Sequence, residues 1–178
     1  MPTDPILAAG GFGEVARRLV VAMLIGCALG INRDLRNKPA GLRTHALVAL
    51  GSALIVVTSI VLAHAVTPPD AGSVLRVVQG VITGIGFLGG GVILRDRETQ
   101  SVTGLTTAAT IWISACLGLT CGAGQWQLAL LAVAITLVVL IFGGPVEQAV
   151  YARLRPGGEA AHRTVRTPGR RATDRARD

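Results

Sequence analysis

The sequence predicts an all-α membrane protein, a polytopic bundle of about five transmembrane helices. Three observations carry this prediction. Of the 178 residues, 51% are hydrophobic and only 15% are charged, against about 25% charged in soluble domains. The mean hydropathy is +0.57. Long runs contain no Asp, Glu, Lys or Arg, and they reach the length of about 20 apolar residues that a spanning helix needs.

The charge-free runs place the helices along the chain. Two of them cover residues 44–69 and 77–94. A third, residues 99–146, is too long for one span, and the glycines of Cys121-Gly-Ala-Gly124 indicate a tight turn inside it. A shorter apolar stretch precedes all three, with Arg17 and Arg18 at its outer end. We therefore expect spans at about residues 15–32, 43–66, 74–94, 104–121 and 126–144.

The charged residues between the spans predict the orientation. Lys and Arg occur between the first and second spans, between the third and fourth, and after the fifth, whereas the other two connections have none. By the positive-inside rule this pattern predicts an outer N-terminus and a cytoplasmic C-terminus. Three cations, Arg17, Arg18 and Arg76, lie on the opposite side and weaken the pattern.

The predicted domain organisation has three parts. Residues 1–14 are an extracytoplasmic segment, residues 15–146 the transmembrane domain and residues 147–178 a basic cytoplasmic tail. From Tyr151 onward the tail holds eight Arg, three acids and two Pro-Gly breaks. This composition is typical of disorder. Anionic lipid headgroups are the expected partner of the tail, with a plain solvated tail as the alternative, and nucleic acid is not expected.

Two short patterns are misleading. Cys27 follows Arg17-Arg18 and an apolar run, as in a lipoprotein signal, but the four further spans already anchor the chain. The string Gly84-Ile-Gly-Phe-Leu-Gly89 matches a dinucleotide fingerprint, but no acidic residue follows about 20 positions later to hold a ribose. We expect no cofactor, no metal site and no enzyme, because the cysteines and histidines form no metal-binding or catalytic arrangement.

Glycines spaced by four are the most informative feature of the third span. Gly80 and Gly84, and then Gly86 and Gly90, form two such pairs. This spacing places small residues on one helix face, where the backbone of a neighbouring helix can approach. The alternative is a locally broken helix whose carbonyl groups line a polar cavity.

Polar side chains form a second pattern inside the spans. The fourth span carries a stripe of hydroxyl groups, and Gln79 and Thr83 lie one turn apart on the third. Hydroxyl groups in membrane helices most often bond the preceding turn or a neighbouring helix. No carboxylate lies centrally in any predicted span, which argues against an ion-coupled pump. The stripe comprises Thr103, Thr106 or Thr107, Thr110 and Ser114.

Three ordered strings resemble the MgtC/SapB family of bacterial inner-membrane proteins. They are Lys38-Pro-Ala-Gly-Leu-Arg-Thr-His-Ala-Leu-Val-Ala-Leu-Gly51, Gly84-Ile-Gly-Phe-Leu-Gly-Gly-Gly-Val-Ile-Leu-Arg95 and Gly104-Leu-Thr-Thr-Ala-Ala-Thr-Ile-Trp112. The resemblance implies a multi-pass protein linked to growth at low Mg²⁺, survival inside host cells and membrane potential. One branch of the family is described as inhibiting the F-type ATP synthase, and other members carry a transporter label.

The resemblance also implies candidate site residues. This chain departs from the family pattern at Asn32, where an acidic residue is frequent, and at Thr103, where Arg or Lys is frequent. It also ends soon after the fifth span, as expected for a short form without a C-terminal soluble domain. The first cytoplasmic loop contributes Arg33, Asp34, Lys38, Gly41, Leu42, Arg43 and Thr44. Helix packing or a pathway is expected to use Gln79, Gly80, Thr83, Gly84, Gly86, Phe87, Gly89, Gly90, Arg95, Gly104, Thr106, Thr107, Thr110 and Ser114.

Three functions remain open from the sequence. The first is a regulator of ion homeostasis or membrane energetics that contacts another membrane protein, or a second copy of itself, through its glycine-rich faces. The second is a small ion or solute transporter or channel, lined by the third span and the hydroxyl stripe of the fourth. The third is a purely structural subunit.

Overall fold

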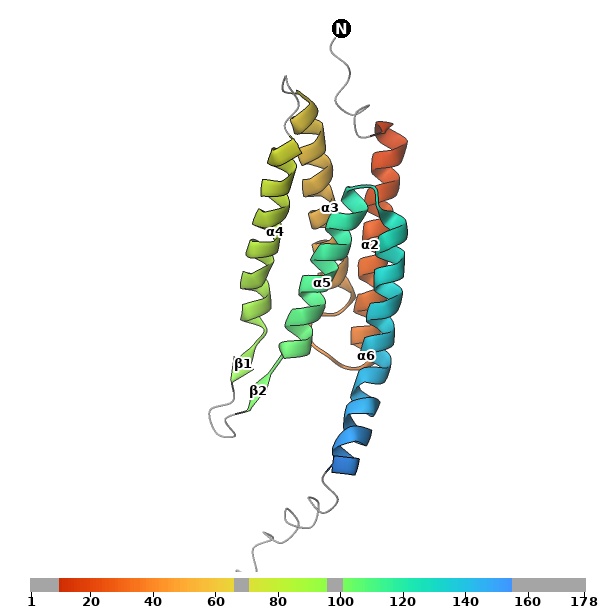
Figure 1. Ribbon diagram of the computed structural model, residues 1–178, viewed down its shortest axis with the longest axis vertical. Helices are drawn as coiled ribbons and strands as arrows, with labels where there is room; N and C mark the ends of the chain where they lie inside the picture. Colours follow the sequence, from red (N-terminus) through yellow and green to blue (C-terminus); the bar gives the residue numbers. More distant parts are fainter. Residues whose placement is uncertain (1–9, 66–70, 96–100, 155–178) are drawn as a thin grey trace, which may run out of the picture. The chain divides into compact units, whose positions relative to one another are not determined.

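The computed structural model describes residues 10–65, 71–95 and 101–154, and within these ranges the chain forms five helices and one short pair of strands (Figure 1). The chain divides into two compact units, residues 1–138 and 139–178. Most of the predicted basic tail, residues 155–178, lies outside the described residues. The elements are α2 (Gly11–Leu35), α3 (Leu42–Ala65), α4 (Ala71–Gly91), β1 (Leu94–Arg95), β2 (Val102–Thr103), α5 (Leu105–Gly122) and α6 (Trp126–Leu154).

The predicted all-α class is confirmed. Among the described helices, four are long and apolar enough to cross a membrane: α3, Gly72–Gly91 of α4, α5 and α6. The helix α2 is not one of these four, and it begins with the charged residues Glu14, Arg17 and Arg18. A fifth crossing therefore stays a prediction.

The helix ends differ from the predicted spans in two places. The helix α4 ends at Gly91 rather than at residue 94, because the next residues enter the β1–β2 pair. The helix α6 continues past the expected end at residue 144 to Leu154. Pro145 lies inside this helix. A proline lacks the amide of one helix hydrogen bond and its ring crowds the carbonyl group of the preceding turn, but here the helix continues through it.

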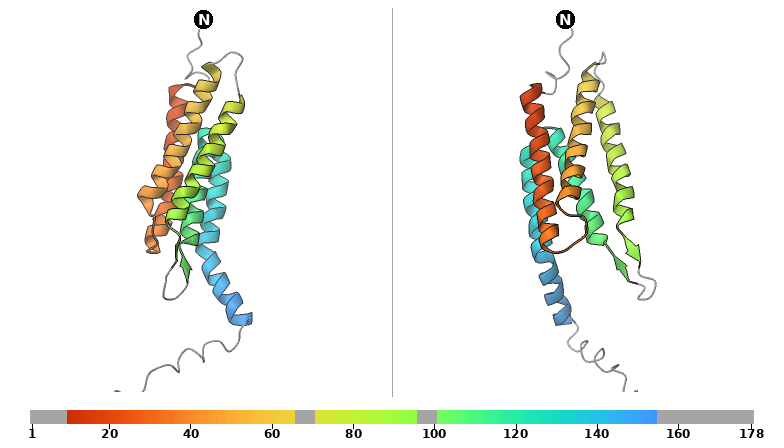
Figure 2. Two further views of the ribbon diagram at one scale, coloured as in Figure 1. Left: turned by 90° about the vertical axis from the view of Figure 1, so that its left-hand side faces the viewer. Right: turned by 180° about the vertical axis from the view of Figure 1, so that it is seen from behind.

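Three helices form the centre of the first unit. α2, α3 and α5 pack against one another, and α4 packs on α3 and α5. Figures 1 and 2 show that successive helices run in opposite directions, so the α2–α3 loop and the β1–β2 pair lie at one end. The α5–α6 turn lies at the other end, beside the start of α2. We call the first of these the loop end of the bundle.

Glycines bring the backbones of the central helices together. A Cβ atom on Gly26 of α2 would lie 2.5 Å from the carbonyl oxygen of His45 in α3. A Cβ atom on Gly122 of α5 would lie 2.6 Å from the carbonyl oxygen of Ala53 in α3. Added Cβ atoms on Gly30 and Gly118 would also collide with the α3 backbone. Small-residue spacing therefore serves packing inside the chain on α2 and α5.

The expected alternative of a broken third helix is wrong, because α4 is continuous from Ala71 to Gly91. Glycine lowers helix propensity by only about 1 kcal/mol per residue. In an apolar surrounding, breaking the helix would leave backbone amide and carbonyl groups without partners, at a cost of several kcal/mol each. The cost of unpaired backbone groups exceeds the cost of low helix propensity. The six glycines between residues 80 and 91 therefore do not break the helix.

A two-residue antiparallel pair joins α4 to α5, and the sequence analysis did not predict it. Leu94 pairs with Thr103 and Arg95 with Val102. Thr103 therefore belongs to a strand and not to the hydroxyl stripe of the helix, which corrects the prediction. Gly104 then starts α5 with a φ of +88°, a left-handed conformation that favours glycine.

Candidate functional site

The loop between α2 and α3 is folded by its own backbone and by one carboxylate. The amides of Arg36 and Lys38 both donate to the carbonyl oxygen of Arg33. The Asp34 carboxylate accepts a hydrogen bond of 3.0 Å from the amide of Leu42, the first residue of α3. Because the first amides of a helix have no partner within the helix, this bond stabilises the start of α3.

Arg33 is buried at the end of α2, with only 3% of its surface exposed. Its Nη2 donates a hydrogen bond of 2.5 Å to the Thr107 hydroxyl of α5, which joins the two helices at the loop end. The ion pairs found among the described residues do not include Arg33, and its Nε is buried without a hydrogen-bond partner. A buried guanidinium without a counter-charge is energetically costly, which makes this residue a candidate for function.

His45 is fully buried one turn into α3. Its Nδ1 lies 3.0 Å from the Gly41 carbonyl oxygen. A carbonyl oxygen can only accept, so Nδ1 carries the hydrogen and Nε2 of a neutral ring is an acceptor. Nε2 is buried without a partner, and so is the Ser114 hydroxyl of α5.

The packing of α3 on α5 places His45 and Ser114 at the same level. Both helices run in the same direction, and Gly118 meets Ala49 while Gly122 meets Ala53. One helical turn earlier, the same register pairs Ser114 with His45. Thr110, on the same face of α5, is buried and donates to the Thr107 carbonyl oxygen. We call Arg33, His45, Thr107, Thr110 and Ser114 the loop-end cluster.

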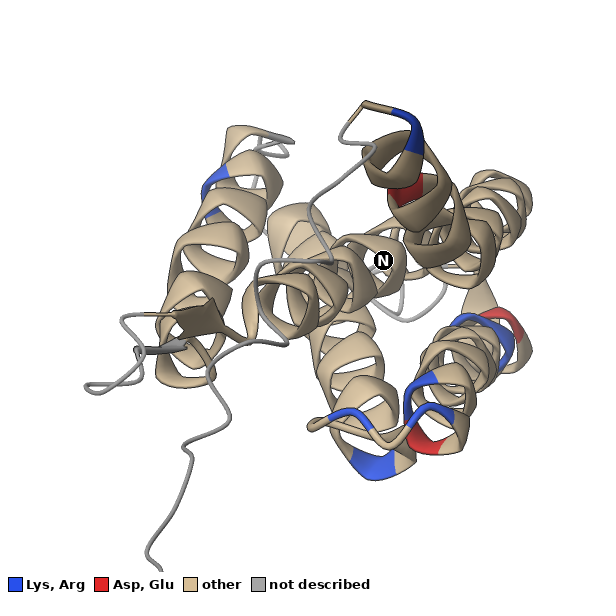
Figure 3. Cartoon of the chain, turned by 90° about the horizontal axis from the view of Figure 1, so that it is seen from below, with Lys and Arg blue, Asp and Glu red and all other residues tan. Residues whose placement is uncertain are grey.

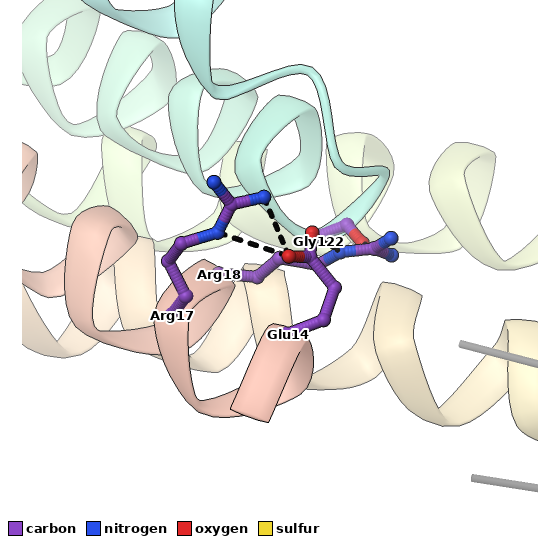
Figure 4. Close-up of polar contacts among 4 residues, drawn as sticks. All are labelled: Glu14, Arg17, Arg18 and Gly122. Atoms are coloured by element: carbon purple, nitrogen blue, oxygen red, sulfur yellow. Dashed lines mark hydrogen bonds and ion pairs between the residues drawn. The ribbon is translucent and has the colours of Figure 1, made fainter. Parts of the chain in front are cut away.

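A second polar group holds the opposite end of the central helices (Figure 4). The Glu14 carboxylate accepts hydrogen bonds of 2.9 Å from the Nε atoms of both Arg17 and Arg18. Arg18 also donates to the Gly122 carbonyl oxygen at the end of α5, at 3.1 Å. The Arg17 guanidinium lies 5.4 Å from the ring centre of Trp126, in cation–π distance. We call this group the N-terminal clamp.

The clamp stabilises the ionised form of its acid. The hydrogen bond from Arg18 is the largest influence, and it lowers the pKa of Glu14 below its ordinary value, with further lowering by Arg17. Glu14 therefore stays ionised at a lower pH than an isolated glutamate would. Arg17 and Arg18, which opposed the predicted orientation, are thus paired with an acid of their own helix.

The glycine face of α4 makes no close helix contact within the described chain, and a contact with another chain stays a prediction. Added Cβ atoms on Gly80, Gly84, Gly86 and Gly90 would meet no atom within 4 Å. Only Gly89 approaches a neighbour, Ala108 of α5. Beside these glycines Phe87 is 86% exposed.

The remaining predicted site residues fall into separate groups. Lys38 in the first loop is exposed, and so are Leu42, Arg43 and Thr44, which were predicted in this loop but form the first turn of α3. On α4, Gln79 and Thr83 are exposed, and Thr83 donates to the Gln79 carbonyl oxygen of its own helix. Thr106 is exposed, so Thr107 and not Thr106 belongs to the buried stripe. The backbone of Arg95 lies in β1.

Sequence reasoning named Arg33 and Thr107 but did not foresee their contact, and it left His45 out of the site. A signal for His45 exists, because it is a polar residue at the start of the long apolar run of the second span.

The charged residues lie near helix ends and in the connections between helices (Figure 3). Within the described ranges no group of three or more His, Cys, Asp or Glu could hold a metal ion.

Comparisons with known proteins identify the chain by its sequence. The family model described as MgtC family matches residues 19–149. Protein SrpB of Synechococcus elongatus is 45% identical over 140 residues, which cover 75% of this chain and 77% of the relative. Protein MgtC of Salmonella typhimurium is 46% identical over 122 residues, covering 68% and 48%.

A third relative carries a functional label. The putative magnesium transporter YhiD of Escherichia coli is 39% identical over 134 residues, which cover 71% of this chain and 59% of the relative. The chain thus spans most of SrpB but about half the length of MgtC. No solved structure matches the chain. With its apolar helices and these sequence matches, the chain is a membrane protein that belongs to the MgtC family.

Proposed function

We propose that this chain is a non-enzymatic regulator of ion homeostasis or membrane energetics in the bacterial inner membrane. It acts by contact between α4 and another membrane-embedded protein. The partner is a complex whose activity matters during Mg²⁺ limitation, such as the membrane sector of an F-type ATP synthase. The proposal draws on the family membership, and the names of MgtC and YhiD support a connection with Mg²⁺.

The open glycine face of α4 carries the proposal. Gly26 and Gly30 of α2 and Gly118 and Gly122 of α5 lie against the α3 backbone. A Cβ atom added to Gly80, Gly84, Gly86 or Gly90 of α4 would instead have no neighbour within 4 Å in the described chain. In lipid, close backbone contact is a main source of helix–helix affinity, and glycines permit it. A face with this composition that packs on nothing in its own chain is suited to receive a helix of another chain.

Photo-crosslinking in native membranes tests the contact. A photoreactive amino acid at Phe87, which is highly exposed on α4, should capture a membrane protein in cells grown at low Mg²⁺. The matched control is the same probe at Leu24, an exposed apolar position on α2. Capture of lipid alone from Phe87, or an identical set of proteins from both positions, would contradict the proposal.

A bulky residue on the glycine face separates loss of contact from loss of folding. A Cβ atom at Gly84 would have no neighbour within 4 Å in the described chain, so we expect Gly84→Leu to reach the membrane in normal amounts and to keep its thermal stability. Growth at low Mg²⁺ should nevertheless be impaired, and crosslinking from Phe87 should be lost. Normal growth and crosslinking with Gly84→Leu would sink the proposal.

The transporter remains the second candidate, since YhiD is named a putative magnesium transporter. The pathway expected between α4 and the hydroxyl stripe has limited geometric support. Thr107 and Thr110 are buried and Thr107 faces Arg33 of α2, whereas α4 contacts α5 through Gly89 and Ala108. Purified chain in liposomes tests this candidate, and flux of Mg²⁺, monovalent ions or small solutes above empty vesicles would favour it over the regulator.

A further inference from the structure

We propose that two copies of this chain pair in the membrane through α4, with the side-chain amide of Gln79 bonded to the same group of the second copy. The inference stands on a lipid-facing amide in the middle of α4 and on the rows of exposed residues around that helix. It is independent of the contact with a different membrane protein proposed above, because the two contacts use different sides of α4.

The exposed residues of α4 form two rows along the helix. Positions that follow one another by alternating steps of four and three residues lie on one helix face. One face of α4 points into the bundle, because Ile85 is buried and Gly89 approaches Ala108 of α5. Two further rows are exposed, and they lie on adjacent sides because each residue turns the helix by about 100°. We call them the amide row, which comprises Gln79, Thr83, Gly86 and Gly90, and the Phe87 row, which comprises Gly80, Gly84, Phe87 and Gly91.

Gln79 places a polar group where the helix crosses the middle of the membrane. It lies about 12 Å from the start of α4 and about 18 Å from its end, in a hydrocarbon layer about 30 Å thick. Its side chain is exposed, and among the described residues none forms a hydrogen bond with the side-chain amide, since the bond from Thr83 uses the backbone carbonyl oxygen. Such a group meets no water in lipid, so a hydrogen bond to another helix stabilises it.

The symmetry of the membrane selects a second copy as the partner of the amide row. Two copies inserted in the same direction are related by a two-fold axis along the membrane normal, so their α4 helices run parallel and equivalent residues face each other. A carboxamide is both donor and acceptor, and two Gln79 side chains therefore form reciprocal hydrogen bonds.

The glycines of the amide row permit this approach. Cβ atoms added to Gly86 and Gly90 would meet no atom within 4 Å in the described chain, so the backbone of a second α4 can come close there. The Phe87 row has no polar side chain that requires an identical partner. It is left for the different protein of the proposed function.

Disulfide crosslinking of the full chain in native membranes tests the pairing. In a variant without the native Cys27, Cys116 and Cys121, Gly86→Cys should form a disulfide-linked dimer of twice the mass after oxidation with copper phenanthroline. The matched control is Gly84→Cys in the Phe87 row, where an added Cβ atom also meets open space, and it should form little of this dimer. Equal dimer formation by both variants, no dimer from Gly86→Cys, or its crosslinking to a different protein instead, would overturn the inference.

Energy transfer between full chains fused to two different fluorescent proteins assigns the pairing to Gln79. In vesicles, Gln79→Leu should need about tenfold more chain per lipid than the wild type for half-maximal transfer, because the hydrogen bonds between the helices are lost. Gln79→Asn keeps a carboxamide and should retain more of the association than Gln79→Leu.

Thr83→Val is the control for this measurement, because the Thr83 hydroxyl donates within its own helix, and its association should match the wild type. Wild-type association in Gln79→Leu, or an equal loss in Thr83→Val, contradicts the pairing. Energy transfer needs no replacement of native cysteines, so it decides the question even where the cysteine-free variant fails to fold.

Discussion

At the scale of single residues, neighbouring positions with the same chemistry have opposite roles. Thr106 and Thr107 are adjacent threonines of the same predicted stripe, yet Thr106 is exposed and Thr107 accepts the hydrogen bond of a buried guanidinium. The sequence pattern includes both, because a helical stripe allows either. Only the packing of α2 against α5 decides which of the two meets Arg33.

We therefore predict different effects of the two substitutions on stability. Thr107→Val removes the hydroxyl that accepts the hydrogen bond of Arg33 Nη2 and should lower the free energy of unfolding by about 0.6–2 kcal/mol, the range for hydrogen bonds between membrane helices. Thr106→Val should change it by less than about 0.5 kcal/mol. Denaturant unfolding in mixed micelles measures both. Equal effects of the two variants would show that the Arg33–Thr107 bond does not stabilise the fold.

The N-terminal clamp predicts a dependence of stability on pH. The pKa of Glu14 is lowered in the folded chain, so its contribution is present above about pH 4.3, the ordinary value for glutamate. It is lost as the pH falls through the lower folded value. The melting temperature of the wild type should therefore fall more steeply between pH 5 and about pH 3 than that of Glu14→Gln. Parallel curves for the two proteins would contradict this linkage.

At the scale of elements, spacing alone could not tell internal from external packing. The pairs Gly26/Gly30 and Gly80/Gly84 have the same separation on predicted spans, but the first pair meets α3 and the second meets nothing in the described chain. Charge-free runs were sufficient to find α3 to α6, because a spanning helix needs a long apolar segment. They could not reveal the two-residue strands β1 and β2, which are too short to show an alternating pattern.

The two classes of glycine should respond differently to alanine. In Gly118→Ala the new methyl group collides with the α3 backbone at Ala49, and overpacking of this kind costs about 1–3 kcal/mol of stability. In Gly84→Ala it meets open space, so the gain in helix propensity should leave the chain equally stable or more stable by up to about 1 kcal/mol. Thermal unfolding in detergent checks the difference, and destabilisation by Gly84→Ala would show that α4 packs more closely than described.

At the scale of the whole molecule, the sequence defined the class and the family, while the site depended on contacts between distant positions. Arg33 and Thr107 are 74 residues apart, and His45 and Ser114 are 69 apart. No local pattern links such positions, so their proximity follows only from how α2, α3 and α5 pack. Successive helices run in opposite directions, as the predicted topology requires. Which end of the bundle faces the cytoplasm stays a prediction.

Accessibility labelling tests that orientation. In a variant without the native Cys27, Cys116 and Cys121, His64→Cys at the end of α3 should react with an impermeant maleimide in intact cells. Lys38→Cys in the α2–α3 loop should react only after the inner membrane is opened, because the positive-inside rule places that loop in the cytoplasm. The reverse pattern of labelling would show that the chain is inserted the other way.

The cation–π contact of the N-terminal clamp also gives the molecule an intrinsic optical reporter. The chain has only two tryptophans, Trp112 and Trp126. Replacing Trp112, which is partly exposed on α5, by phenylalanine leaves Trp126 beneath the Arg17 guanidinium as the single indole fluorophore. The fluorescence emission of Trp126 would then change when Arg17 moves away from its ring. An unlabelled protein in vesicles or living cells would in this way report when the start of α2 separates from the α5–α6 turn.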